Sequence, residues 1–258
     1  MSNFEFLIII YGFNSSLLFT IILRSIKKKS PRILLVYLFL PILLSIPLSL
    51  LLQDVLEISD ISYRQLIANI LVSVWCLKSF VSYKSLKVTL MANFLDDIRE
   101  SISDKNYSKI IYSVFKLSLF QSLCFSALFS LNYLSGYSSL NFLDLLGLTI
   151  CIIGSCFEFI SEREIKLFSN NRSKIIKTGL WSYTRHPNLV GIYLFFLGIQ
   201  ILALSAVGSH WSLVGLFLVT YLIFKTLIPS TEKKLILKYQ DYADYKETVP
   251  RLFNLKFK

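Results

Sequence analysis

Hydrophobic residues along this chain fall into long runs separated by short polar connectors. A membrane-spanning helix needs about 20 mostly apolar residues. The runs that approach this length lie at about 5–23, 33–53, 65–83, 110–134, 141–161, 188–207 and 211–228. The third run is the weakest, because polar residues interrupt it: Arg64, Gln65, Asn69 and Lys78. The pattern predicts an all-α polytopic transmembrane helical bundle of about seven spans.

The charges of the connectors predict the orientation of these spans. The first connector, RSIKKKSPR, is basic, whereas the second, QDVLEISDISYR, carries three acidic residues and one arginine. Basic and non-basic connectors then alternate to the basic C-terminal segment. Because Lys and Arg collect on the cytoplasmic side, we expect a non-cytoplasmic N-terminus and a cytoplasmic C-terminus.

Composition agrees with a membrane protein and narrows the alternatives. Hydrophobic residues make up 54% of the 258 residues and charged residues only 17%, below the roughly 25% of soluble domains. The net charge of +11 is therefore interpreted as topological, and no nucleic-acid partner is expected. The first run lacks a basic flank and a cleavage site, so it is interpreted as a retained span. The expected location is the endoplasmic reticulum membrane in a eukaryote or the inner membrane in a bacterium.

Candidate chemistry is concentrated in the second half of the chain. Residues 1–135 offer spans and few specific polar signals, so we divide the chain into 1–135 and a C-terminal membrane domain, 136–258. The stretch 85–108 is amphipathic and fits either an interfacial helix or a solvated connector. The four cysteines lie in apolar runs without a C-x-x-C pair, so neither a metal site nor a disulfide framework is expected.

The stretch TGLWSYTRHPN, residues 178–188, lies at the edge of the sixth run. Proline is favoured at the first helical position, so Pro187 begins a helix and His186 precedes it. The unpaired N–H groups and the positive dipole end of such a helix attract anions. Arg185 adds a cation suited to phosphate or carboxylate, and Thr178 and Gly179 allow the backbone to approach a ligand.

Trp181 and Tyr183 in the same stretch offer flat apolar faces with polar tips. Arg, Trp and Tyr are also ordinary anchors at a membrane interface. The residues alone therefore leave a ligand site and a structural anchor as open alternatives.

A second polar segment, FEFISEREIKLF, occupies residues 157–168. Glu158 and Glu162 are four residues apart and share one helix face. An unpaired carboxylate near the membrane boundary is costly, so a polar interior with a partner is expected. Arg163 and Lys166 are the local partners if the segment is merely structural.

A third polar segment, IPSTEKKLILKYQDYADYKETVPRLF, follows the last run. Glu232 lies at the mouth of the seventh span, and Tyr239, Tyr242 and Tyr245 recur at near-helical spacing. An interfacial helix with an aromatic belt is the structural alternative. Since the predicted topology places all three segments on the cytoplasmic side, we expect them to form one pocket.

These segments resemble a known group of proteins. TGLWSYTRHPN is similar to the TGLW-x-Y-[ST]-RHPNY-x-GE motif of the steroid 5-alpha-reductase C-terminal-like membrane family, long catalogued as a domain of unknown function. FEFISEREIKLF resembles that family's FE-x-x-[AS]-D-x-Q segment. IPSTEKKL with its later tyrosines resembles the closing IPLLEK…Y-x-x-Y segment. The three motifs occur in the family's order over roughly residues 140–255.

The resemblance implies an integral membrane oxidoreductase that uses NADPH to reduce a carbon–carbon double bond of a lipid or steroid-like substrate. It places Arg185 and His186 on the cofactor phosphates and Asn188 on the nicotinamide or its ribose. Glu162 and Glu232 become candidate partners for ribose or base. The whole cofactor-binding set expected is Glu162, Thr178, Gly179, Arg185, His186, Asn188, Glu232 and Tyr242. Tyr183 is the nearest candidate proton donor in the motif region.

Two departures keep other functions open. Leu189 and Ile192 stand where the family motif has Tyr and Glu, and Glu164 replaces its Gln. Isoprenylcysteine carboxyl and phospholipid methyltransferases carry a related RHP-x-Y-x-G motif, so an S-adenosylmethionine-dependent methyltransferase is the alternative. A non-catalytic lipid-binding membrane protein is the third hypothesis, and the sequence indicates no oligomeric state.

Overall fold

The computed structural model describes residues 3–27, 40–52, 61–83, 107–134, 139–168, 175–206 and 209–252. Every regular element among them is helical, and these residues contain no strand. The first half supplies α1 (Asn3–Lys27), α3 (Leu40–Leu51), α4 (Tyr63–Tyr83), α6 (Tyr107–Cys124) and α7 (Ser126–Leu134). The second half supplies α8 (Phe142–Phe168), η3 (Gly179–Ser182), α9 (Pro187–Ser205), η4 (Ser209–Ser212), α10 (Leu213–Tyr221), η5 (Leu222–Leu227), α11 (Ile228–Lys238) and α12 (Tyr242–Thr248). The all-α class predicted from the sequence is therefore confirmed, and the stretch 85–108 lies almost wholly outside the described residues.

Within the described ranges, three helices are long and apolar enough to cross a membrane: Phe142–Phe168, Pro187–Ser205 and His210–Lys238. The helices α6 and α7 make a fourth if they count as one span, although they are bent by 59° at the break between them. The apolar parts of α1 and α3, Glu5–Ile21 and Leu40–Leu51, are shorter. If the bent pair is counted as one span, candidate membrane helices lie in both 1–135 and 136–258.

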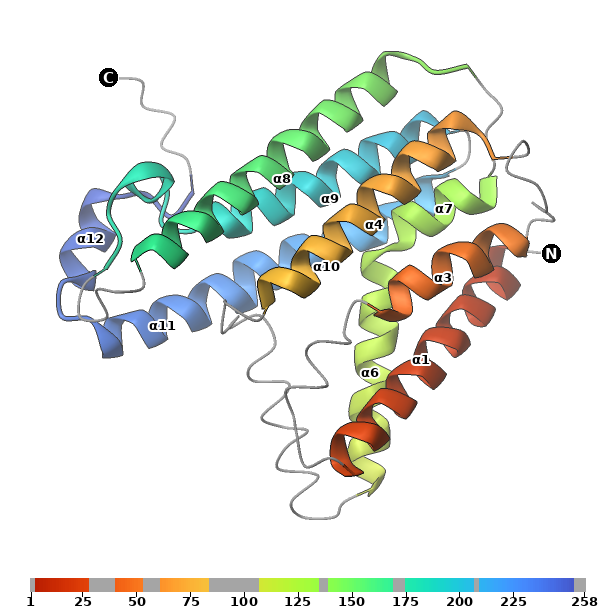
Figure 1. Ribbon diagram of the computed structural model, residues 1–258, viewed down its shortest axis with the longest axis horizontal. Coiled ribbons are helices and arrows are strands. Elements are labelled where there is room, and N and C mark those ends of the chain that lie inside the picture. The colour runs from red at the N-terminus through yellow and green to blue at the C-terminus, as the bar shows by residue number, and fades with distance from the viewer. Residues whose placement is uncertain are drawn as a thin grey trace.

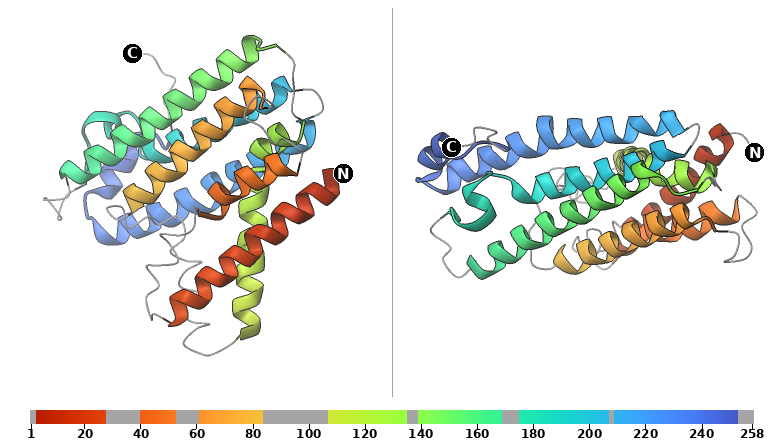
Figure 2. Two further views of the ribbon diagram at one scale, coloured as in Figure 1. Left: turned by 45° about the vertical axis from the view of Figure 1, so that its right-hand side comes forward. Right: turned by 90° about the horizontal axis from the view of Figure 1, so that it is seen from above.

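The helices form two groups, which meet where α7 packs on α4 and α9, α6 on α10, and α3 on α4 (Figure 1). α4, α8, α9 and α10–α11 run in similar directions, whereas α1 and α6 lie side by side at a steeper angle. Seen from above, α10–α11 lies along one face, α9 and α8 lie in the middle, and α4 lies on the opposite face (Figure 2). The end of α8, η3, α11 and α12 gather at one end of the molecule.

Glycines bring α8 and α9 into backbone contact. Gly147 faces Gly198, and Gly154 faces Gly191, in an antiparallel arrangement with glycines seven residues apart on each helix. A Cβ atom built on Gly154 would lie 2.7 Å from the carbonyl oxygen of Gly191. Small residues allow close helix packing in membranes, where apolar side chains gain little by leaving lipid. This close pair fixes the start of α9 relative to the end of α8.

The polar residues that weaken the third hydrophobic run have partners in other helices. Arg64 forms a buried bidentate pair with Asp144, with both N–O distances at 2.7 Å. The Asn69 amide bonds to the side chain of Asn132 at 3.0 Å, and Gln65 donates to the Asn132 carbonyl at 3.0 Å. These contacts hold α4 against α7 and α8.

A π-helical segment, Leu222–Leu227, interrupts the helix that continues from α10 into α11. Pro229 follows it within the same helix. Proline donates no N–H bond and its ring clashes with the carbonyl four residues earlier, and π-turns accommodate such a mismatch. The helix therefore continues past the expected end of the seventh run, residue 228, and carries Glu232 to the end of the molecule where α9 begins.

Candidate functional site

The segment before α9 folds into a short 3₁₀ turn, η3, because Gly179 and Glu164 shape its first residues. Gly179 has a φ of +62°, in the left-handed region that glycine adopts without cost. The Glu164 carboxylate accepts the Leu180 N–H at 3.2–3.3 Å. Glu164, the position where the related motif has Gln, therefore caps this turn from α8.

Contacts with α12 and the residues after it hold the next part of the segment. The Tyr245 hydroxyl donates to the Trp181 carbonyl at 2.6 Å. The Arg185 N–H donates to the Pro250 carbonyl at 3.1 Å, and the Thr184 hydroxyl donates to the Arg251 carbonyl at 3.2 Å. Sequence segments about 65 residues apart are thus joined at the start of α9.

Helix α9 begins at Pro187, and His186 occupies its N-cap position without a capping side-chain bond. The first helical bond is donated by Val190 to the His186 carbonyl at 3.0 Å. Proline has no N–H, so the N–H groups of Asn188 and Leu189 are the donors that the helix leaves without a carbonyl partner. The predicted helix start at Pro187 is confirmed.

One carboxylate, Glu232, is surrounded by three basic side chains. Arg185 Nη1 lies 3.0 Å and His186 Nε2 lies 3.3 Å from Glu232 Oε1, and Arg251 Nη2 lies 3.0 Å from Oε2. Glu232, Arg185 and His186 are buried, while Arg251 is half exposed. We call these four residues the Glu232 cluster; its two arginines exceed its single carboxylate by one positive charge.

Several buried polar atoms beside this cluster make no well-aligned hydrogen bond: Arg185 Nε and Nη1, Trp181 Nε1 and the Tyr242 hydroxyl, which lies against the Arg185 side chain. Arg185 Nη1 is within ion-pair distance of Glu232 but is not aligned for a hydrogen bond. Buried polar groups without partners are rare and need an explanation. Together with the excess positive charge, these donors suit an anionic ligand with several acceptor atoms.

Burial also perturbs the phenols of α12. Burial, followed by the nearby Glu232 carboxylate, raises the pKa of Tyr242 to about 12. Burial and the neighbouring Tyr242 raise the pKa of Tyr245 further above its ordinary value. Both phenols are therefore neutral at physiological pH and remain hydrogen-bond donors.

A second charged group joins α4 to α8. Lys78 Nζ lies 2.7 Å from Glu158 Oε1 and 3.2 Å from Glu162 Oε1, and Trp75 Nε1 donates to Glu158 Oε2 at 2.8 Å. Glu162 Oε2 is buried without a partner. We call Lys78, Glu158 and Glu162 the Lys78 cluster.

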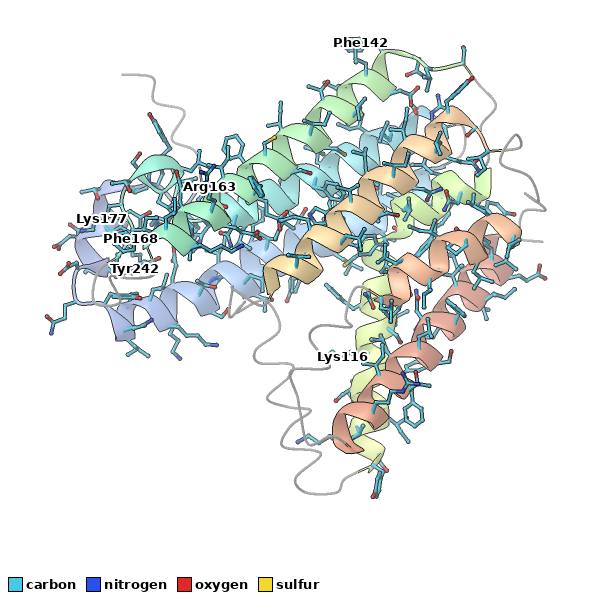
Figure 3. The ribbon with its side chains drawn as sticks, viewed as in Figure 1. Lys116, Phe142, Arg163, Phe168, Lys177 and Tyr242 are labelled. Atoms are coloured by element: carbon cyan, nitrogen blue, oxygen red, sulfur yellow. The ribbon has the colours of Figure 1, made fainter. Side chains whose placement is uncertain are left out.

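Both clusters include residues near the region where α8 packs on η3 and α9. The backbone of Glu158 lies against Gly191 of α9, and Glu164 bonds to Leu180 of η3. Glu162 lies between those two positions on α8, opposite the segment that carries Arg185 and His186. The labelled side chains Arg163, Phe168, Lys177 and Tyr242 mark this end of the molecule, and Phe142 marks the far end of α8 (Figure 3).

The structure brings only some of the predicted site residues together. Arg185, His186, Glu232 and Tyr242 are buried side by side, and Glu162 belongs to the adjacent Lys78 cluster. Asn188 is half-buried at the start of α9, while Thr178 and Gly179 are exposed beside η3.

Tyr183, the predicted proton donor, and the two departures from the family motif, Leu189 and Ile192, belong to neither cluster. Tyr183 has a side chain that is 68% exposed and takes no part in either cluster. Leu189 is buried in the hydrophobic core, and Ile192 packs against it. Apolar residues at these two positions therefore serve packing of α9.

Sequence reasoning missed three residues that complete the clusters: Lys78, Trp75 and Arg251. Lys78 was recognised only as a polar interruption, although a lysine inside an apolar run is itself a signal of a buried partner. Arg251 follows Pro250 close to the C-terminal end, and no spacing rule connects it to Glu232.

Comparison with family models gives one match, described as "Protein of unknown function (DUF1295)", over residues 20–249. The chain therefore belongs to the DUF1295 family. No curated protein and no solved structure matches the sequence.

Proposed function

We propose that this member of the DUF1295 family is an integral membrane oxidoreductase that uses NADPH to reduce a carbon–carbon double bond of a lipid or steroid-like substrate. The observation that carries the proposal is the Glu232 cluster. It unites the TGLW…RHPN segment with the IPSTEK segment, two motifs of the reductase-like resemblance. The third motif contacts the same region through Glu158, which lies against Gly191, and Glu164, which accepts the Leu180 N–H.

The residues of the cluster fit the phosphates of such a cofactor. Arg185 offers buried N–H donors without well-aligned hydrogen bonds, and an arginine fork matches phosphate oxygens. The free N–H groups at the start of α9 add donors and the positive end of a helix dipole. Tyr242, whose buried hydroxyl makes no well-aligned hydrogen bond, supplies a further neutral donor. Exposed Thr178 and Gly179 leave the backbone before η3 accessible to the ligand.

The cofactor supplies a hydride when bound, and the protein positions it. In this proposal Glu232 orients Arg185 and His186, and the half-buried Asn188 contacts the nicotinamide end. The exposed side chain of Tyr183 favours a proton donor buried elsewhere in the bundle.

The proposed topology has seven spans, with the Glu232 cluster on the cytoplasmic side. Asp144 and Glu162 are 18 positions apart on α8, or roughly 27 Å at 1.5 Å per residue. That separation is close to the roughly 30 Å of the hydrocarbon core. The charged groups at the two ends of α8 thus fit the two membrane boundaries, and an apolar substrate reaches the site from the lipid.

Thermal unfolding in detergent tests the proposal. NADPH at about 100 times its dissociation constant adds roughly 2.7 kcal/mol of stability, and Arg185→Ala is expected to abolish this gain. Arg163→Ala removes an exposed arginine at the same end of the molecule and is expected to leave the gain unchanged. Stabilisation by S-adenosylmethionine alone would support the methyltransferase alternative, because the same helix start suits a carboxylate. Stabilisation by neither ligand would contradict both the reductase and the methyltransferase hypotheses.

A further inference from the structure

The Lys78 cluster is a second buried charged site, and its charges do not balance. It contains one ammonium and two carboxylates within 2.7–3.2 Å. Of the elements that pack closely on α8, α4 contributes Arg64 as its other charge, and Arg64 is paired with Asp144. On α8 itself, Arg163 and Lys166 are exposed and Glu164 caps η3. α9 and η3 carry no Asp, Glu, Lys or Arg. Arg185 and His186, just before α9, are engaged by Glu232.

An unbalanced negative charge is costly at a buried position in a membrane protein. Both oxygens of Glu158 have donors, Lys78 and Trp75. Glu162 Oε1 contacts Lys78, whereas its Oε2 is buried and has no partner. A single proton shared by the two carboxyls removes the excess charge, and Glu162 Oε2 is the oxygen left to carry it.

We propose that the Lys78 cluster holds one exchangeable proton and delivers it to the substrate during reduction of the double bond. This inference rests on the proposed reductase function. It assigns the proton-donor role to the buried carboxyl pair instead of the exposed Tyr183.

The position of the cluster suits that role. Glu162 lies on α8 between the positions that contact Leu180 and Gly191, opposite the segment with Arg185 and His186. On its apolar side, the Trp75 ring that bonds to Glu158 stacks on Phe195 with centroids 5.1 Å apart. The cluster therefore lies beside an aromatic part of the core.

Bound NADPH would supply the hydride that forms a C–H bond at one carbon of the double bond, and would itself be oxidised to NADP⁺. The other carbon takes the proton, so a C–H bond forms while the carboxyl O–H bond breaks and its electron pair stays on the carboxylate.

Resetting the cluster requires one proton from water. The Lys78 side chain is 19% exposed, compared with 5% for Glu158 and 9% for Glu162. Lys78 is thus the member with the best access to solvent. Its ammonium passes a proton to the carboxylate and regains one from water.

Infrared spectroscopy of the whole protein in detergent tests the proposal without a substrate. The carbonyl stretch of a protonated carboxylic acid is separate from the carboxylate and amide bands and shifts in heavy water. We expect such a band in the wild type at neutral pH. Glu158→Gln or Glu162→Gln is expected to abolish it, because each leaves one carboxylate balanced by Lys78.

Lys78→Met is expected to increase the band, since two buried carboxyls would then lack a cation. Lys78→Arg keeps the positive charge and is expected to keep the single band. This variant can be measured if Lys78→Met does not fold. Glu247→Gln changes an exposed carboxylate and should leave the spectrum unaltered. Absence of the band in the wild type, or its persistence in both glutamine variants, would overturn the proposal.

An NADPH titration of the same samples separates this inference from the proposed function. A Glu162-dependent band together with NADPH binding supports both. The band without any NADPH binding would show a protonated cluster but overturn its role in reduction, along with the reductase proposal. NADPH binding without the band would leave the reductase proposal standing and remove the cluster as its proton donor.

Discussion

Replacement of Gly154 by alanine should separate α8 from α9. The new Cβ atom would lie 2.6 Å from the Phe195 nitrogen and 2.7 Å from the Gly191 oxygen, whereas ordinary contacts begin at 3.4 Å. Both obstructing atoms belong to the backbone, so the helices must move apart by about 0.8 Å, from 2.6 Å to 3.4 Å at the nearer atom. Overpacking of this kind costs about 1–3 kcal/mol. Alanine's better helix propensity offsets at most about 1 kcal/mol.

Thermal unfolding of the purified protein in one detergent measures this loss. Each kcal/mol corresponds to roughly 2–4 °C for a chain of this length, so the Gly154→Ala midpoint should fall by several degrees. Gly12→Ala is the matched control, because nothing lies within 4 Å of its added Cβ on α1; its midpoint should stay or rise. Equal midpoints for the two variants would refute the close packing of α8 on α9.

Three further predictions concern the buried polar groups. Asp144→Asn should lower the free energy of unfolding by about 3–5 kcal/mol, since it removes the carboxylate of the buried bidentate pair with Arg64; a loss below 1 kcal/mol in denaturation would contradict the buried pair. Tyr242→Phe should lower stability at neutral pH by at most about 1 kcal/mol, because its hydroxyl lies against Arg185 without a well-aligned hydrogen bond, but should weaken NADPH binding in titrations. The pKa of Tyr242 is raised from 10 to about 12. The stability that this shift contributes is fully present below pH 10 and is lost as the pH rises toward 12. Tyr242→Phe should therefore lose less stability than the wild type over that range, and parallel curves would exclude the perturbed phenol.

The helical class, and the positions of several helices, could be predicted from hydrophobic runs alone. Pro187 marked the start of α9 because proline is favoured at that position. The break between α6 and α7 could not be predicted, because the run 110–134 contains neither proline nor glycine. The extension of the last helix beyond residue 228 was hidden by Pro229, which normally disfavours a helix interior.

The candidate site was predicted in part. Local motifs indicated Arg185, His186 and Glu232, since a helix start and a carboxylate have recognisable sequence signals. Lys78 and Arg251 could not be assigned, because their partners lie 80 and 19 residues away and only the packing of helices brings them together. The exposure of Tyr183 likewise depends on the 3₁₀ turn that Glu164 caps, which spacing does not reveal.

The central claim is that the Glu232 cluster binds the anionic part of NADPH. Isothermal titration of NADPH into the detergent-solubilised protein tests it most directly. We predict saturable binding of one molecule per chain. In Arg185→Ala the binding should weaken by at least tenfold, since hydrogen bonds to charged groups contribute about 1.5–3 kcal/mol. Arg163→Ala should bind as the wild type does. An absence of saturable heat in the wild type, or equal affinity in Arg185→Ala, would contradict the account.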